Sequence, residues 1–215
     1  MLQGLIGRKV GMSQFFDTDG KVIPVTVVEV GPCAVIYKKT AAVDGYDAVQ
    51  IGFDEITKEK CVNKPLKGHF KANNVKAYKY LKEFKSEDSD EYKSGDIVTV
   101  GNFKDLSYVD VIGLSIGKGF QGVVKRHHFK GGPGGHGSMF HRRPGAIGMR
   151  EHPGETLKGK RMAGRMGGKR ITVKNLKVVK IFEDKNLILL NGSVPGPKNG
   201  IVVVKQTNAF IKSNK

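Results

Sequence analysis

One stretch of 54 residues, from Gly117 to Arg170, constrains this chain more than any other feature. It holds 13 of the 37 lysines and arginines and 15 of the 29 glycines, but only two acids, Glu151 and Glu155. Its net charge is +11, out of +17 for the whole chain. Such a segment cannot pack a core of its own, because like charges repel and glycine loses the most backbone entropy on ordering. We therefore expect an arm that becomes ordered on a polyanion, and nucleic acid is the best candidate.

The rest of the chain is large enough for a globular body. The 215 residues suit one domain with an appendage, or two small domains, and 39% of them are hydrophobic. A sequence pI of about 9.8 is typical of proteins that bind nucleic acid or another anionic surface. Membrane binding is the weaker interpretation, because no apolar run approaches the roughly 20 residues of a spanning helix, and the first residues do not resemble a signal peptide. We expect Cys33 and Cys61 to be free thiols in a reducing cytoplasm.

Short β-strand patterns follow one another outside the arm. The segment from Lys21 to Val30 is rich in β-branched residues and is bounded by turn sequences. Shorter segments of the same kind recur on both sides of the arm, and their spacing favours a barrel or a sandwich over a βαβ sheet. The further expected strands are Cys33–Tyr37, Ala48–Phe53, Ile97–Val100, Val109–Ser115, Ile171–Val173, Leu176–Phe182, Leu187–Leu190 and Ile201–Lys205.

Some segments do not fit this strand pattern. The residues from Asn73 to Lys85 fit a helical period and a strand period equally well. The acidic run Glu87–Glu91 is expected to be a solvated loop, and Gln121–Arg126 a short helical turn. From Phe129 to Lys169 neither period is present, which is acceptable only for a functional segment outside the globular body.

These patterns divide the chain into three parts. Residues 1–116 form the first part of the body, with a small α/β insertion around residues 60–95. Residues 117–170 form the extended basic arm. Residues 171–215 supply the remaining strands of the body and a C-terminal tail. The arm is therefore an insertion between two groups of strands that belong to one body.

One motif in the arm has an enzymatic interpretation. The segment Gly117–Gly122 matches G-x-G-x-x-G directly after an expected strand, as in dinucleotide-binding folds. Such folds also need a second parallel strand and an acid about 20 residues further on, for the ribose. In this chain the corresponding positions, 141–143, are basic. A flexible glycine hinge, with Lys118 beside a phosphate, explains the motif better.

Metal binding and catalysis have little support in the sequence. Structural zinc sites prefer paired ligands, usually with cysteines, and neither cysteine lies near the histidines of the arm. No nucleophile elbow is present. The two carboxylates of the arm, Glu151 and Glu155, are surrounded by cations, and ion pairs within the arm explain them. We therefore expect no catalytic site, no cofactor, no metal and no small-molecule substrate. The histidines considered as metal ligands are His127, His128, His136 and His141.

The basic clusters are the strongest indication of function. A solvated surface mixes both signs of charge, whereas the arm is almost entirely cationic. Arginine makes bidentate contacts to phosphate and stacks on exposed bases, and histidine can stack on bases or donate a hydrogen bond to phosphate. An irregular arm without a recognition helix suits folded RNA better than a DNA groove. The expected RNA-binding residues are Arg8, Lys9, Lys118, Lys125, Arg126, His127, His128, Lys130, His136, His141, Arg142, Arg143, Arg150, Lys158, Lys160, Arg161, Arg165, Lys169 and Arg170.

Several of these segments resemble the bacterial-type large-subunit ribosomal protein L3 family. The similarity runs from about residue 2 to residue 205, in the order expected of the family. The segments that carry it are Gly4–Met12, Ile23–Val27, Gly117–Gly122, His136–Ser138, Pro144–Gly148, Lys158–Gly164 and Gly192–Gly196.

The resemblance implies both a fold and a function. The implied fold is mainly β, an antiparallel β-barrel body of the translation-protein type with minor α content and a long irregular Gly/Arg-rich arm. The implied function is to bind large-subunit ribosomal RNA early in assembly, in the cytoplasmic ribosome, beside the large-subunit proteins L14 and L19. The arm would reach toward the peptidyl transferase centre. The residues implied nearest to that centre are Gly145, Ala146, Ile147, Gly148 and Met149.

One departure from the family and one alternative function remain open at the level of sequence. Some members of the family carry a methylated glutamine just after the Gly-x-Ile-Gly stretch, where this chain has Met149, so that modification is not expected. The alternative function is that of a general nucleic-acid chaperone without ribosomal specificity, which would bind any polyanion.

Overall fold

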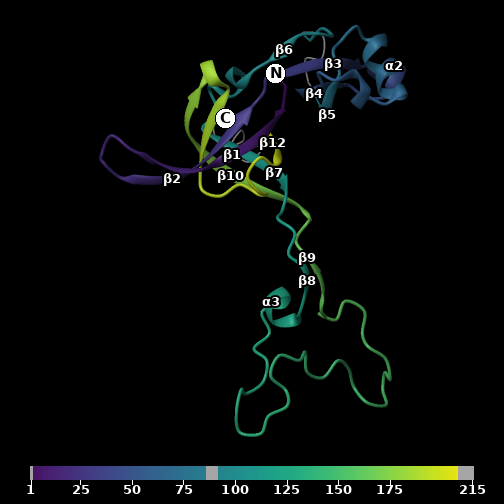
Figure 1. Cartoon of the computed structure of the whole chain (residues 1–215), viewed down its shortest axis with the longest axis vertical. Coiled ribbons are helices and arrows are strands. Elements are labelled where there is room, and N and C mark those ends of the chain that lie inside the picture. The colour runs from purple at the N-terminus through teal and green to yellow at the C-terminus, as the bar shows by residue number, and fades with distance from the viewer. Residues whose placement is uncertain (1, 86–91, 208–215) are drawn as a thin grey trace. The chain divides into compact units, whose positions relative to one another are not determined.

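The computed structural model describes residues 2–85 and 92–207 (Figure 1). The acidic run Glu87–Glu91 lies outside the described residues, as does the tail beyond residue 207. The chain divides into two compact units. One consists of Met1–Leu114 together with Arg170–Lys215, and the other of Ser115–Lys169.

A closed six-stranded barrel forms the centre of the first unit (Figure 1). Its strand order is β1-β12-β7-β10-β11-β2, and every neighbouring pair is antiparallel. The prediction of a mainly β fold with an antiparallel barrel is therefore confirmed. The barrel strands are β1 (Gly4–Phe16), β2 (Val22–Val30), β7 (Tyr108–Leu114), β10 (Arg170–Phe182), β11 (Leu187–Asn191) and β12 (Ile201–Gln206).

Aliphatic side chains from all six strands fill the barrel. On β7, Val109 and Val111 are fully buried while the residues between and beside them are partly exposed, the alternation expected when one face of a strand points inward. The same core includes Leu5 from β1, Val28 from β2 and Ile188 from β11. The predicted strands at Lys21–Val30, Val109–Ser115, Leu187–Leu190 and Ile201–Lys205 are thus confirmed, with shifts of one residue at some ends. The segments Ile171–Val173 and Leu176–Phe182, predicted as two strands, form the single strand β10.

Strand β1 was not predicted, although it is 13 residues long. Its glycines lower strand propensity, yet the barrel needs two of them. A Cβ atom at Gly4 would lie 2.7 Å from the carbonyl oxygen of Val204, and one at Gly7 would collide with the carbonyl oxygen of Glu29. Glycine therefore allows β1 to approach β12 and β2 closely.

A second antiparallel sheet in the same unit has the order β5-β4-β3-β6. The predicted strands at Cys33–Tyr37 and Ala48–Phe53 belong to this sheet and not to the barrel. In the ambiguous segment from Asn73 to Lys85 the strand period prevails, because Tyr78–Phe84 pairs with β4. The elements of this region are β3 (Cys33–Lys39), α1 (Ala41–Asp44), β4 (Ala48–Glu55), η1 (Glu59–Cys61), α2 (Lys64–Ala72), β5 (Tyr78–Phe84), β6 (Ile97–Val98) and η3 (Val100–Phe103).

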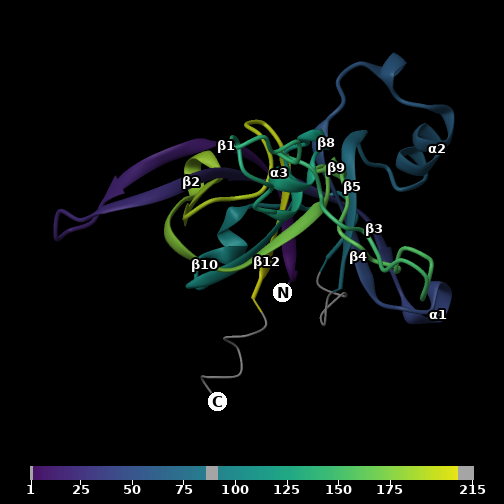
Figure 2. The same ribbon diagram turned by 90° about the horizontal axis from the view of Figure 1, so that it is seen from below.

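Helix α2 covers part of this sheet through one aromatic side chain. Phe70 is the buried residue of the helix and packs with Ile36 and Val62 in a small apolar cluster. Figure 2 shows α2 and the β1–β2 ribbon at opposite ends of the first unit. The short 3-10 helix η4 (Glu183–Lys185) connects β10 to β11.

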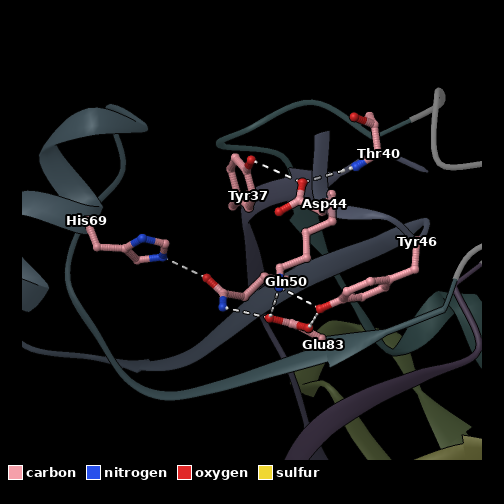
Figure 3. Close-up of polar contacts among 8 residues, drawn as sticks. Tyr37, Thr40, Asp44, Tyr46, Gln50, His69 and Glu83 are labelled. Atoms are coloured by element: carbon pink, nitrogen blue, oxygen red, sulfur yellow. Dashed lines mark hydrogen bonds and ion pairs between the residues drawn. The ribbon is translucent and has the colours of Figure 1, made fainter. Parts of the chain in front are cut away.

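A polar network ties the strands of the second sheet to one another and to α2 (Figure 3). The carboxylate of Glu83 lies 3.2 Å from the ammonium of Lys39 and accepts a 2.8 Å hydrogen bond from the hydroxyl of Tyr46. Gln50 donates to the same carboxylate at 3.4 Å and lies 2.7 Å from a ring nitrogen of His69. Burial raises the pKa of Glu83, but the hydrogen bonds from Tyr46 and Lys39 outweigh it and hold that pKa below its ordinary value.

Both cysteines are free thiols, as predicted. Cys33 is buried and its thiol lies 3.4 Å from the carbonyl oxygen of Ile6, whereas Cys61 is exposed. Burial raises the pKa of Cys33 to about 12, because a thiolate would lose its hydration there.

Candidate nucleic-acid interface

The second unit begins and ends as a two-stranded antiparallel ribbon. Strand β8 (Gly119–Gln121) pairs with β9 (Gly164–Met166), and the pairing continues toward the barrel strands. The amide of Lys118 donates to Met166 at 2.9 Å, and the amide of Ser115 donates to Lys169 at 2.9 Å. We refer to residues 115–121 and 164–169 as the stem.

In the motif Gly117–Gly122, where a flexible hinge was expected, residues Gly119–Gln121 form strand β8 and pair with β9. Gly167 has a φ of +72°, and a Cβ atom there would collide with the carbonyl oxygen of Ile116. Glycine at position 167 therefore allows the two strands of the stem to approach closely, in addition to making the backbone flexible. The dinucleotide interpretation of the same motif is wrong, because β8 pairs with an antiparallel strand and not with a parallel βαβ partner.

A short helix, α3 (Val123–His127), follows the stem close to the predicted helical turn at Gln121–Arg126. Val123 is buried, and two basic side chains turn toward the returning chain. Arg126 donates to the carbonyl oxygen of Met162 at 2.6 Å, and Nε2 of His127 lies 3.1 Å from the same oxygen. Because a carbonyl only accepts, His127 carries a proton on Nε2 in this contact. Both residues brace the second unit internally while remaining half-exposed.

Between α3 and β9 the chain runs as loops without helix or strand (Figure 1). One turn is closed where Gly132 donates to the carbonyl oxygen of His141 at 3.0 Å. Nδ1 of His141 lies 3.1 Å from the carbonyl oxygen of Pro133, so that nitrogen carries the proton. Gly131 has a φ of +77°, and a Cβ atom there would collide with His141. The sequence of Phe129–Lys169 has no helical or strand period, and the structure is irregular from Phe129 up to the start of β9.

The uncharged segment Gly145–Met149 lies in these loops, and its glycines approach neighbouring chain. A Cβ atom at Gly145 would lie 3.4 Å from the ring of Phe140, and one at Gly148 would lie 3.2 Å from the carbonyl oxygen of Glu155. Ala146 is exposed, as are Ile147 and Met149. The segment therefore presents small and apolar side chains to solvent.

Most of the predicted RNA-binding side chains in this unit are exposed. The residues that separate these side chains in the sequence are mainly small, such as glycine, and are too poor in apolar groups to form a core within the unit. The backbone of His128 is left-handed and ends α3, and that of His136 is also left-handed. The exposed residues are Lys118, Lys125, His128, Lys130, His136, His141, Arg142, Arg143, Arg150, Lys158, Lys160, Arg161, Arg165 and Lys169.

The predicted ion pairs of Glu151 and Glu155 are not formed. Both residues are exposed, and within residues 115–169, all of which the structure describes, no carboxylate lies within 4.0 Å of a lysine or arginine nitrogen. An exposed pair contributes only about 0–1 kcal/mol, too little to determine the path of a glycine-rich loop. The positive charge of the unit is consequently not neutralised from within.

Three predicted residues lie in the first unit. Arg8 pairs with Asp54 at 3.0 Å. Lys9 donates to the carbonyl oxygens of Val194 and Gly196 at 2.9 and 3.1 Å. Arg170 is exposed at the start of β10. The pKa of Lys82 is lowered mainly by the burial of its own ammonium group and further by the positive charge of Arg170. Arg8 and Lys9 thus have partners within the body.

The described residues contain neither a metal-binding cluster nor a membrane-spanning helix. No group of three or more His, Cys, Asp or Glu residues within 2–85 and 92–207 is placed to hold a metal ion. None of the helices in these same ranges is long and apolar enough to cross a bilayer.

Sequence reasoning missed the exposed apolar side chains of the second unit. Phe120 is 77% exposed and Met139 is 85% exposed. The sequence Gly119-Phe120-Gln121-Gly122 could have indicated an exposed ring, because a basic, glycine-rich segment offers a phenyl ring few apolar side chains to pack against.

Comparisons with known proteins agree on one family. The sequence profile of the family described as "Ribosomal protein L3" matches residues 93–186. The large ribosomal subunit protein uL3 of Syntrophomonas wolfei is 49% identical over 205 residues, covering 95% of this chain and 96% of that protein. The uL3 proteins of Geobacter sulfurreducens and Carboxydothermus hydrogenoformans are both 50% identical, and each alignment covers 96% of this chain and 98% of the relative.

Proposed function

The chain belongs to the ribosomal protein L3 (uL3) family, and on this premise we propose that it binds and organises large-subunit ribosomal RNA early in assembly. Membership makes it a structural constituent of the large subunit of the cytoplasmic ribosome, and such proteins act by binding and not by catalysis. The proposal assigns the main RNA contact to Ser115–Lys169, the second compact unit.

The observation that carries this proposal is the unneutralised charge of the second unit. Its lysines and arginines are almost all exposed, and its two acids pair with none of them. Each RNA phosphate that such a cation neutralises releases condensed counterions, and this release drives binding. Small residues between the cations let the backbone itself approach the RNA. Arg8 and Lys9 contribute less in this account, because RNA would have to compete with their partners in the body.

The segment Gly145–Met149 has a different proposed role. It carries no charge, so it is a poor phosphate clamp, but its small and apolar side chains suit a tight space between RNA strands. Following the family resemblance, this segment lies near the peptidyl transferase centre and packs the RNA that performs the chemistry. The large-subunit proteins L14 and L19 are the proposed protein neighbours of the body.

Shortening this segment and reversing the charges of Arg161 and Arg165 should have different effects. Deleting Gly145–Met149 should allow subunits to assemble but change the rate of the puromycin reaction or the sensitivity to drugs that bind at the catalytic centre. The variant Arg161→Glu with Arg165→Glu should instead impair assembly. Subunits lacking the segment but with unchanged puromycin rate and drug sensitivity would leave it without the proposed role.

A general nucleic-acid chaperone is the alternative function, since charge alone would attract any polyanion. Competition distinguishes the two functions. A labelled large-subunit rRNA fragment bound to the chain should be displaced by the same unlabelled RNA at a much lower concentration than by small-subunit rRNA or heparin. Equal displacement by all three at matched phosphate concentration would favour the chaperone.

A further inference from the structure

The stem exposes an aromatic ring that has no protein partner. Phe120 lies in the middle of β8 and is 77% exposed, more than any other phenylalanine among residues 2–85 and 92–207. Throughout those ranges the ring pairs with no other aromatic ring and with no cation, whereas Phe53, Phe84 and Phe182 each lie near a cationic side chain. The ring is therefore free to stack on a ligand, and covering it would remove apolar surface from water.

The surroundings of Phe120 are open and cationic. The residue before it is Gly119, which places no side chain beside the ring. Arg165 lies directly opposite Phe120 in the β8–β9 register. Residues directly opposite in an antiparallel pair have Cβ atoms about 4.5–5.5 Å apart and share one face. Lys118 lies two residues before Phe120 in the sequence, just outside β8. Both cations are exposed.

An exposed aromatic ring with a cation opposite it matches the chemistry of a nucleotide. A base offers a flat π-face for stacking, and its phosphates offer negative charge at each side. Stacking on a phenyl ring is possible only for a base that is not already stacked within a duplex, as in a loop, a bulge or a strand end.

We propose that Phe120 is a stacking platform for an unpaired base of ribosomal RNA, with Arg165 and Lys118 contacting the phosphates beside that base. The inference rests on the proposed RNA-binding function and adds a specific contact to it. It gives the stem a role in recognising RNA shape, because a continuous duplex offers no free base to the ring, whereas the other cations of the unit neutralise phosphate regardless of sequence.

A fluorescence measurement tests the proposal, because the chain contains no tryptophan. The variant Phe120→Trp places a single reporter on the platform, and indole stacks on bases as phenyl does. Saturating the full-length variant with a large-subunit rRNA fragment should quench its emission strongly. The matched control is Phe16→Trp, at a 60% exposed phenylalanine in a strand of the body, and its emission should change little.

Affinity and salt dependence provide the second test. Phe120→Leu keeps an apolar side chain but removes the π-face, and should weaken binding about 5- to 150-fold while leaving the log–log salt slope unchanged. Arg165→Gln should instead reduce the magnitude of that slope by roughly 0.7–0.9, as expected for one lost phosphate contact.

The outcomes separate this inference from the function on which it rests. Wild-type binding without preference for large-subunit rRNA would overturn the proposed function. Normal preference, combined with unquenched Phe120→Trp emission and wild-type affinity for Phe120→Leu, would overturn only the stacking platform. Emission that changes on adding a neighbouring ribosomal protein but not on adding RNA would likewise overturn it, in favour of a protein contact.

Discussion

At the scale of single residues, the two cysteines differ in the property that controls thiol reactivity. The reactive species is the thiolate, and burial raises the pKa of Cys33 to about 12, so near neutral pH this group stays protonated as well as inaccessible. Cys61 is exposed. Iodoacetamide at pH 8 should therefore modify Cys61 alone in the folded protein, and both cysteines after unfolding. Mass spectrometry of tryptic peptides measures this, and equal labelling rates at both sites in the native protein would contradict the buried position of Cys33.

Glu83 supplies a pH-dependent contribution to stability. Its pKa is lower in the folded protein than in the unfolded chain, so its contribution is present above the unfolded pKa and is lost as pH falls through the folded pKa. Glu83→Gln should lower the thermal midpoint at pH 7 by about 1–3 °C, since the pair with Lys39 is partly exposed. The gap to wild type should close on acidification. The control is Glu55→Gln, which removes the exposed ion pair with Lys76. A difference in thermal midpoint between Glu83→Gln and wild type that does not change with pH would argue against the network.

At the scale of secondary structure elements, the strands found from sequence were those with continuous β-branched runs, such as Val22–Val30 and Ile201–Gln206. Strands β1, β8 and β9 were missed because glycine interrupts the pattern, and the reason for the glycine lies in a distant neighbour such as Val204 beside Gly4. No local pattern contains that information. The same holds at the candidate site. Charge predicted the arm, but the internal contacts of Arg126 and His127 depend on where Met162 returns.

Gly167 should be critical to the stem, because its φ of +72° and the carbonyl oxygen of Ile116 leave no room for a side chain. Gly167→Ala should abolish amide protection at Lys118, whose hydrogen bond to Met166 closes the stem, and weaken rRNA binding, while the thermal midpoint of the body stays within about 1 °C of wild type. Hydrogen exchange and calorimetry measure the two effects. Gly122→Ala, at an open position, is the control. Unchanged protection at Lys118 in Gly167→Ala would mean that the stem tolerates a side chain.

At the scale of the whole molecule, we propose that the barrel provides stability and that the second unit binds RNA. Leu114 and Arg170, which flank the second unit, are directly paired in the β7–β10 register, so the barrel needs only a short turn between them. Replacing Ser115–Lys169 with a short Gly/Ser linker should therefore leave a single cooperative unfolding transition, because the buried core lies in the other unit. Calorimetry decides the matter, and loss of a cooperative transition would show that the second unit contributes to the core.

The affinity for large-subunit rRNA over a series of salt concentrations, compared between the full chain and this linker variant, tests the central claim most directly. We expect the full chain to bind tightly with a steep log–log slope, about −0.7 to −0.9 for each phosphate contacted. The variant keeps the barrel but lacks the exposed cations of residues 115–169, so it should bind weakly and with a much flatter slope. Equal affinity and equal slope for the two proteins would mean that the second unit is not the main RNA contact.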